Sequence, residues 1–176
     1  MTTFYAIIPS RMQSSRLPEK PLKDIAGKPM VVRVAERALE SGAKDVVVAT
    51  DHEAIMKACE AQGIKAVMTS AKHPTGTDRL AETVEKMGLP PEAIVVNVQG
   101  DEPLIPPQVI AQVAQLLEDH PECDMATAAH PIDSLEEFMS PNVVKVALDN
   151  NGNAITFSRA PIPWPRDAFR ADPNTL

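Results

Sequence analysis

Runs of apolar residues alternate with polar stretches along most of the chain. Short runs rich in Val, Ile and Ala, each bounded by polar or turn-forming residues, are typical of buried strands. We expect strands at residues 5–8, 46–50, 66–68, 94–98 and 125–129.

Apolar positions at helical spacing predict a helix after each of the first four strands. The first helix lies between Pro29 and Gly42. Asp51 and Thr77 are expected to cap the next two helices, because their side-chain oxygens can accept from the first free N–H groups. The fourth helix carries an apolar stripe within residues 109–117.

A different pattern appears at residues 143–157. Apolar side chains alternate at 144, 146 and 148, and the turn-forming sequence NNGN precedes a second extended stretch at 155–157, which predicts an appended β-hairpin. The strand and helix alternation before it predicts an α/β fold, with a mostly parallel, Rossmann-like sheet flanked by helices.

Length and composition narrow the function. A chain of 176 residues fits one domain, residues 1–176. Aromatic residues are only 3% of the chain and the net charge is -7, so we expect no nucleic-acid partner. Cys59 and Cys123 are isolated, which favours neither a zinc site nor a disulfide. No targeting or membrane-spanning segment is recognisable, so we expect a cytoplasmic protein without a membrane partner.

The loop after the first strand is basic, although the chain as a whole is acidic. Only Glu19 and Asp24 oppose its cations, and such a local reversal predicts a site for a small polyanion, most simply a nucleoside triphosphate, although a solvated basic loop is the alternative. The five cations are Arg11, Arg16, Lys20, Lys23 and Lys28.

Four polar clusters each follow a predicted strand directly. They cover residues 10–28, 50–52, 70–79 and 99–102. The carboxyl ends of parallel strands meet at one edge of a sheet, where ligands bind in such folds, so we expect the clusters to converge on one site.

Neither a phosphate-binding P-loop nor a dinucleotide fingerprint is present, so long cationic side chains must hold any phosphates. Arg11 and Arg16 offer planar forks for phosphate or carboxylate oxygens, and Lys20 offers a point charge. Asp101 follows a buried strand and is a candidate ligand for Mg²⁺, which takes one or two carboxylates together with substrate phosphates. Alternatively, Asp101 only closes a turn.

Gly76 permits close approach of a ligand, and Arg79 lies in a first helical turn, where a bound anion would justify a cation. His73 is interpreted as a surface residue of the polar loop at residues 72–79. Arg159 and Arg166, in the proline-rich tail, either bind a carboxylated acceptor or belong to a subunit contact.

The chain resembles the 3-deoxy-manno-octulosonate cytidylyltransferase (CMP-Kdo synthetase) family, whose members have the nucleotide-diphospho-sugar transferase fold. VQGDEP with HPTGTDR and FSRAPIPWPRD separates this branch from other sugar nucleotidyltransferases, while Glu19 and Ser10 replace the family's usual Gly and Ala. The matching blocks are IIPSRMQSSRLPEKPL, VVVATDHE, HPTGTDRLAE, VVNVQGDEPLI and NVVKVALDNNGNAITFSRAPIPWPRD.

The resemblance implies transfer of CMP from CTP to the anomeric hydroxyl of 3-deoxy-manno-octulosonate (Kdo), with release of pyrophosphate, for lipopolysaccharide synthesis. It also implies a Mg²⁺ requirement and a homodimer with the hairpin close to the partner. The implied roles are triphosphate binding by Arg11 and Lys20, metal binding by Asp101, nucleotide binding by Gly76, Thr77 and Arg79, and sugar binding by Gln99, Arg16 and Arg166. Arg159 is a further candidate for the sugar from its place in the tail.

Family members continue beyond this length and carry a second metal-binding Asp there, so we expect this chain to lack the family's C-terminal region. Two other interpretations stay open at this point. One is a cytidylyltransferase for another acidic sugar, such as a sialic-type acid. The other is a non-catalytic nucleotide-binding or dimerisation module.

Overall fold

The computed structural model describes residues 2–13 and 17–172. Its residues form two compact units, Met1–Thr127 and Ala128–Leu176, which are described separately below. The prediction of a single domain over the whole chain stays a prediction. Among the described residues, no helix has the length and apolar character needed to cross a bilayer.

The first unit is built on a four-stranded sheet with strand order β5-β4-β1-β6. The strands are β1 (Phe4–Ser10), β4 (Asp45–Thr50), β5 (Lys65–Met68) and β6 (Ile94–Asn97), and all three pairings between them are parallel. The predicted α/β fold with a parallel sheet is therefore confirmed.

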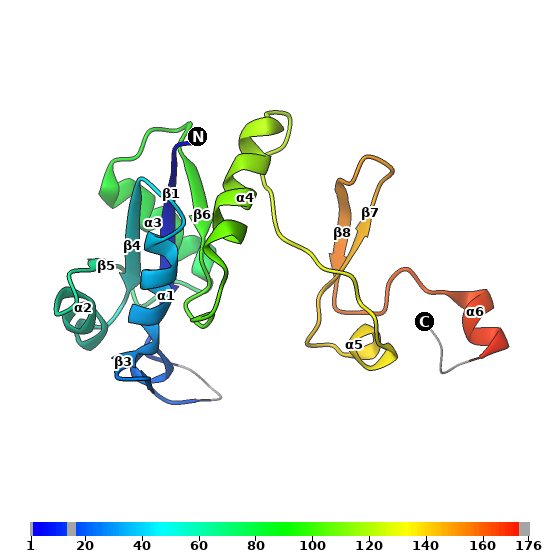
Figure 1. Ribbon diagram of the computed structural model, residues 1–176, viewed down its shortest axis with the longest axis horizontal. Helices are drawn as coiled ribbons and strands as arrows, with labels where there is room; N and C mark the ends of the chain where they lie inside the picture. The colour runs from blue at the N-terminus through cyan, green and yellow to red at the C-terminus, as the bar shows by residue number, and fades with distance from the viewer. Residues whose placement is uncertain (1, 14–16, 173–176) are drawn as a thin grey trace. The chain divides into compact units, whose positions relative to one another are not determined.

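Helices cover both faces of this sheet (Figure 1). On one face, α1 (Met30–Leu39), α2 (Glu53–Glu60) and α4 (Pro107–Asp119) pack on alternate strand residues such as Ala6 and Ile8. On the other face, α3 (Gly76–Met87) places Leu80 against Ile7 and Ala49. Burial of both faces explains why the strands read as continuous apolar runs.

Two helix caps differ from the expectation. The cap of α3 is Thr75, not Thr77, because Thr75 and Asp78 form a reciprocal capping box. The cap of α2 is His52, not Asp51, because the His52 ring accepts from the Ala54 N–H and Asp51 is bound elsewhere.

The loop between β1 and α1 contains three short elements. They are the 3-10 helix η1 (Lys20–Leu22) and the two-residue strands β2 (Asp24–Ile25) and β3 (Lys28–Pro29), which pair in antiparallel fashion. The cationic loop therefore contains regular secondary structure, at η1 and at the β2–β3 pair.

The second unit contains α5 (Leu135–Met139), the antiparallel hairpin of β7 (Lys145–Leu148) and β8 (Ala154–Ser158), and α6 (Arg166–Ala171). The hairpin is as predicted. The strand expected at residues 125–129 was wrong, because this stretch is irregular. Its Ala and Thr side chains offer little apolar surface to bury, and Met125 is exposed.

Candidate active site

A cleft of about 690 Å³ opens at the carboxyl end of the first unit's sheet. Its walls come from the residues after β1, the η1 loop, the loop entering α3, and the loop after β6. The convergence expected from the polar clusters is therefore present for three of the four. The lining residues used below are Ser10, Arg11, Gln13, Lys20, His73, Gly76, Arg79, Gln99, Gly100 and Asp101.

The loop after β6 lies directly against the end of β1. The Val98 N–H donates to the Ile7 carbonyl at 3.0 Å and continues the pairing beyond β6. At Gly100, an added Cβ would stand 2.6 Å from the Pro9 carbonyl oxygen, which is too close for any side chain. Glycine is required here by this contact, which brings Asp101 to the mouth of the cleft.

Lys20 and Asp101 form an ion pair across the cleft, with Nζ 2.6 Å from Oδ2. The two side chains are 32% and 49% exposed. Lys20 begins η1, and the preceding Glu19 has φ 55 and ψ 28, a left-handed conformation that favours Gly. The replacement of the family's Gly by Glu19 therefore falls at a position where the backbone itself prefers glycine.

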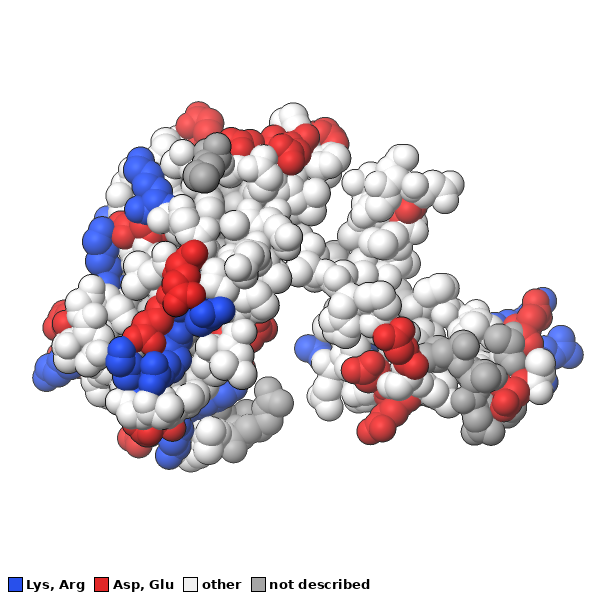
Figure 2. Space-filling model, viewed as in Figure 1, with Lys and Arg blue, Asp and Glu red and all other residues white. Residues whose placement is uncertain are grey.

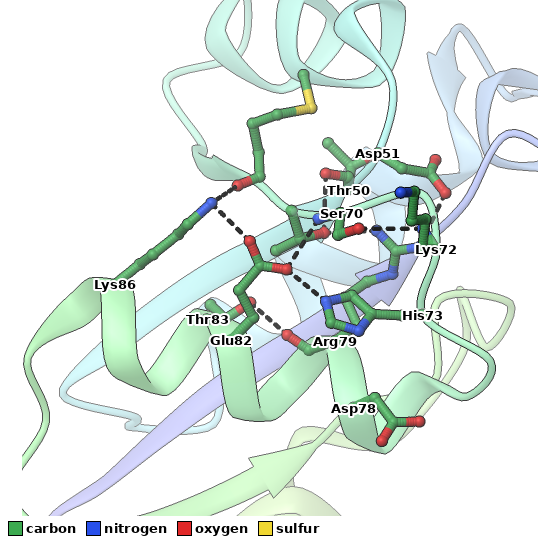
Figure 3. Close-up of polar contacts among 12 residues, drawn as sticks. Thr50, Asp51, Ser70, Lys72, His73, Asp78, Arg79, Glu82, Thr83 and Lys86 are labelled. Carbon is green, nitrogen blue, oxygen red and sulfur yellow. Dashed lines mark hydrogen bonds and ion pairs between the residues drawn. The ribbon is translucent and has the colours of Figure 1, made fainter.

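Arg79 is held inside the protein by its own neighbours (Figure 3). Its Nη2 lies 2.8 Å from Asp51 Oδ2 and its Nη1 donates to Thr69 Oγ1 at 2.5 Å. Asp51 also accepts from the Met12 N–H at 3.4 Å and so ties the start of the cationic loop to α3. The anion expected beside Arg79 is thus supplied by the protein, and a role in binding nucleotide stays a prediction.

A second network of hydrogen bonds and ion pairs joins His73, in the loop before α3, to Glu82 and Lys86 on α3 (Figure 3). Glu82 bonds His73 Nε2 and accepts from Lys86 Nζ at 2.7 Å and from the Ser70 N–H at 2.8 Å. These donors, Lys86 first, lower the pKa of Glu82 from 4.5 to about 2. The network fixes the loop between β5 and α3, which holds His73 at the cleft.

The cations of the loop after β1 do not all reach the cleft. Lys28 pairs with Glu36, whose pKa this hydrogen bond lowers, and Arg33 binds the same Glu36 at 3.1 Å. Arg37 pairs with Glu40 at 2.7 Å on the same helix. Figure 2 accordingly shows basic and acidic side chains side by side on the first unit. Among the described cations of this loop, Arg11 and Lys20 line the cleft, and Lys20 is paired with Asp101.

The structure gathers most of the predicted site residues. Arg16 lies outside the described residues, and Thr77 does not line the cleft. Arg159 and Arg166 belong to the second unit, where they bind the Pro141 carbonyl at 2.8 Å and Asp167 at 2.9 Å. The predicted residues that line the cleft are Arg11, Lys20, Gly76, Arg79, Gln99 and Asp101.

Several lining residues were not predicted as site residues, among them the polar residues Ser10, Gln13 and His73. Ser10 is buried, and its hydroxyl makes no hydrogen bond within the described part of the chain. The available signal was position alone, since all three lie in polar clusters that follow a strand.

Asp101 places one carboxylate at the cleft. Over residues 2–13 and 17–172, no group of three or more His, Cys, Asp or Glu side chains forms a ready-made metal site. A single carboxylate nevertheless fits Mg²⁺, because Mg²⁺ keeps several waters and takes phosphate oxygens from its substrate.

Comparisons with known proteins define the family. The cytidylyltransferase family model matches residues 5–172. This chain belongs to the cytidylyltransferase family. Within the family, it is 60% identical over 171 residues to the 3-deoxy-manno-octulosonate cytidylyltransferases of two Neisseria gonorrhoeae strains, NCCP11945 and FA 1090. The match covers 97% of this chain and 67% of those proteins, so this cytidylyltransferase spans about two thirds of their length.

Solved structures agree. A structure of CMP:2-keto-3-deoxy-manno-octonic acid synthetase complexed with CTP is 43% identical, with a TM-score of 0.82 over 95% of this chain and 68% of that one. A cytidylyltransferase from Leptospira borgpetersenii, 24% identical with a TM-score of 0.53, covers 66% of this chain and 48% of that one and shares the fold. The resemblance read from the sequence blocks is confirmed, and the chain is a nucleotidyltransferase.

Proposed function

We propose that this cytidylyltransferase transfers CMP from CTP to the anomeric hydroxyl of Kdo and releases pyrophosphate, as the activation step for lipopolysaccharide synthesis. The observation that carries the proposal is the ion pair of Lys20 and Asp101 in the cleft. The two residues are 81 positions apart in the sequence, and their charged atoms lie 2.6 Å apart. The chain that brings them together is 60% identical to Kdo cytidylyltransferases. The cytoplasm is the proposed location, because CTP is made there.

The proposed reaction needs charge stabilisation more than covalent chemistry. The anomeric oxygen forms a bond to the α-phosphorus, the bond to the bridging oxygen of the β-phosphate breaks, and the hydroxyl proton passes to solvent. Arg11 and Lys20 are proposed to hold the triphosphate and to stabilise charge on the departing pyrophosphate. Lys20 would then exchange its bond to Asp101 for one to phosphate.

Asp101 is proposed to hold Mg²⁺ together with the phosphate oxygens. The bound metal would add positive charge at the transferring phosphoryl group. When the triphosphate binds and Lys20 leaves Asp101, the Asp101 carboxylate would become available to Mg²⁺.

The remaining predicted residues divide between the two substrates. Gly76, Thr77 and Arg79 are proposed for the nucleotide, supported by the position of Gly76 and Arg79 at the cleft. The proposed ligands of the sugar acid are Gln99, Arg16, Arg159 and Arg166.

A homodimer is also proposed, with a second copy of the chain against the hairpin of the second unit. The support is an exposed apolar surface on β8, where Ile155 and Phe157 are 67% and 52% exposed. Because these residues are two apart on a strand, they share one face.

The direct test is pyrophosphate release from CTP and Mg²⁺, measured with Kdo, with a sialic-type acid, and with no acceptor. We expect release only with Kdo. Asp101→Asn should lower the rate by about a hundredfold or more, because charge stabilisation in the transition state is lost. It should also remove the strengthening of CTP binding by Mg²⁺, read by titration calorimetry.

Asp133→Asn is the matched control, because Asp133 is an exposed carboxylate of the second unit and lies outside the cleft. It should behave as the parent. Release that ignores the identity of the acceptor, or an Asp101→Asn protein that keeps the parent's Mg²⁺ response, would contradict the proposal.

A further inference from the structure

A lysine side chain is buried in the second unit at the start of the hairpin. Lys145 is the first residue of β7 and is only 2% exposed. Its ammonium donates to the carbonyl oxygens of Ser140, Val143 and Arg159 at 2.7, 2.8 and 3.0 Å. Within the described part of the chain it forms no ion pair with a carboxylate. A buried ammonium needs compensation, and three carbonyls match its three N–H donors.

The three carbonyls come from different segments, so the ammonium joins them. Ser140 is the C-terminal cap of α5, Val143 lies in the loop before β7, and Arg159 follows β8 directly. Without Lys145, the three carbonyl oxygens would lose the donor that they share, and among the described residues only that of Ser140 would keep a bond, from the Val143 N–H at 3.3 Å. This ammonium therefore joins the loop 140–143 to the turn 158–160.

Arg159 is held at both its backbone and its side chain. Its carbonyl accepts from Lys145, and its Nη1 donates to the Pro141 carbonyl at 2.8 Å. The residue is exposed, and the bond to Pro141 uses one of the five N–H donors of a guanidinium. Both contacts anchor the guanidinium to the loop that Lys145 organises.

We infer that Lys145 is a positioning residue for the acceptor site, because its ammonium fixes the turn from which Arg159 reaches a sugar carboxylate. The inference rests on the proposed function, in which Arg159 binds the carboxylate of Kdo. Lys145 itself touches no substrate. Recognition of a carboxylate by Arg depends on planar, bidentate geometry, so displacement of the Arg159 backbone weakens acceptor binding and leaves CTP binding intact.

Steady-state kinetics on the whole protein separate positioning from stability. Lys145→Met removes the ammonium and keeps an unbranched stem, and we expect it to raise KM for Kdo about tenfold or more, since small misplacements are costly. KM for CTP should stay within about twofold of the parent. Lys145→Arg, which keeps a buried cation, should recover part of the loss. Lys57→Met is the matched control, because it removes an exposed lysine, 77% accessible, from α2 of the first unit.

A merely structural role gives a different result. Partial unfolding would lower the active fraction and hence kcat, with KM for Kdo unchanged, and that outcome would overturn the inference. A double substitution sharpens the test. If Lys145 acts through Arg159, Lys145→Met with Arg159→Ala should have the KM for Kdo of Arg159→Ala alone. The inference would also be overturned if the two substitutions together raised KM for Kdo by the product of their separate effects. The same holds if Arg159→Ala alone keeps the parent's KM for Kdo.

Amide hydrogen exchange tests the same inference without turnover. Lys145→Met should speed exchange in segments 140–143 and 158–160 and leave the sheet of the first unit unchanged. Unchanged exchange in both segments would overturn the inference. Absence of Kdo-dependent turnover in the parent would instead count against the proposed function, and exchange would then report only whether Lys145 holds the two segments together.

Discussion

The Arg79 guanidinium and the Asp51 carboxylate form an ion pair with little access to water, since their side chains are 4% and 14% exposed. Removal of one charge leaves the other buried without a partner, which costs about 3–5 kcal/mol. We therefore expect Arg79→Met to lower the free energy of unfolding by about this amount. Urea denaturation monitored by circular dichroism measures it.

The exposed ion pair of Lys57 and Glu53 provides the comparison. Their charged atoms lie 3.9 Å apart and the side chains are 77% and 81% exposed. Lys57→Met should cost less than about 0.5 kcal/mol, because solvent screens such pairs. An Arg79→Met protein as stable as Lys57→Met would show that the buried pair contributes nothing to the fold.

At the residue scale, the sequence predicted which polar residues lie near the strand ends, but not which residues they bind. Arg11, Lys20, Gln99 and Asp101 were assigned to the site from their order after strands, and all four line the cleft. The partner of Arg79 was missed, because Asp51 is 28 positions away and was already interpreted as a helix cap. Periodicity describes which face a residue occupies and carries no information on pairing between distant loops.

Two glycines that approach the same proline test how the loops around the cleft are packed. A Cβ on Gly100 would lie 2.6 Å from the Pro9 carbonyl oxygen, whereas a Cβ on Gly76 would lie 3.6 Å from the Pro9 side chain, an ordinary contact. Gly100→Ala should destabilise the protein by about 1–3 kcal/mol, as overpacking does. It should also weaken CTP binding, because the backbone before Asp101 must shift.

Gly76→Ala is the matched substitution at the first residue of α3. It should be neutral, or stabilising by up to about 1 kcal/mol, because Ala has the higher helix propensity. Thermal unfolding and CTP titration of both variants give the answer. Equal losses of stability at the two positions would refute the packing argument. Weaker CTP binding by a fully stable Gly76→Ala would support the predicted contact of Gly76 with nucleotide.

Elements with a strong apolar period were predicted well, and their ends were not. The four strands of the sheet lie where the pattern placed them, because each buries a face of Val, Ile or Ala. The hairpin was also located, by its alternation and its turn sequence, although its apolar residues Leu148, Ile155 and Phe157 are exposed. The strand expected at 125–129 failed, since small side chains give β-structure little to bury. The caps of α2 and α3 shifted by one and two residues, because several polar residues stand at each helix start and only geometry selects among them.

At the scale of the whole molecule, charge and apolar surface have separate roles. The chain carries a net charge of -7, so attraction of a triphosphate has to come from local positive charge at the cleft, where Arg11 and Lys20 lie. The apolar surface of β8 lies in the other compact unit. Substitutions on β8 can therefore test the proposed association without altering the residues that line the cleft.

The proposed homodimer gives the last prediction. We expect Ile155→Asp to shift the protein from dimer to monomer in sedimentation velocity at micromolar concentration, because it places a charge in the apolar centre of the proposed interface. Thr156→Asp is the matched control, since neighbouring strand residues point to opposite faces. It adds the same charge and should leave the dimer intact. If both variants sediment as the parent does, β8 lies outside the interface, and if the parent itself is monomeric, the homodimer is refuted.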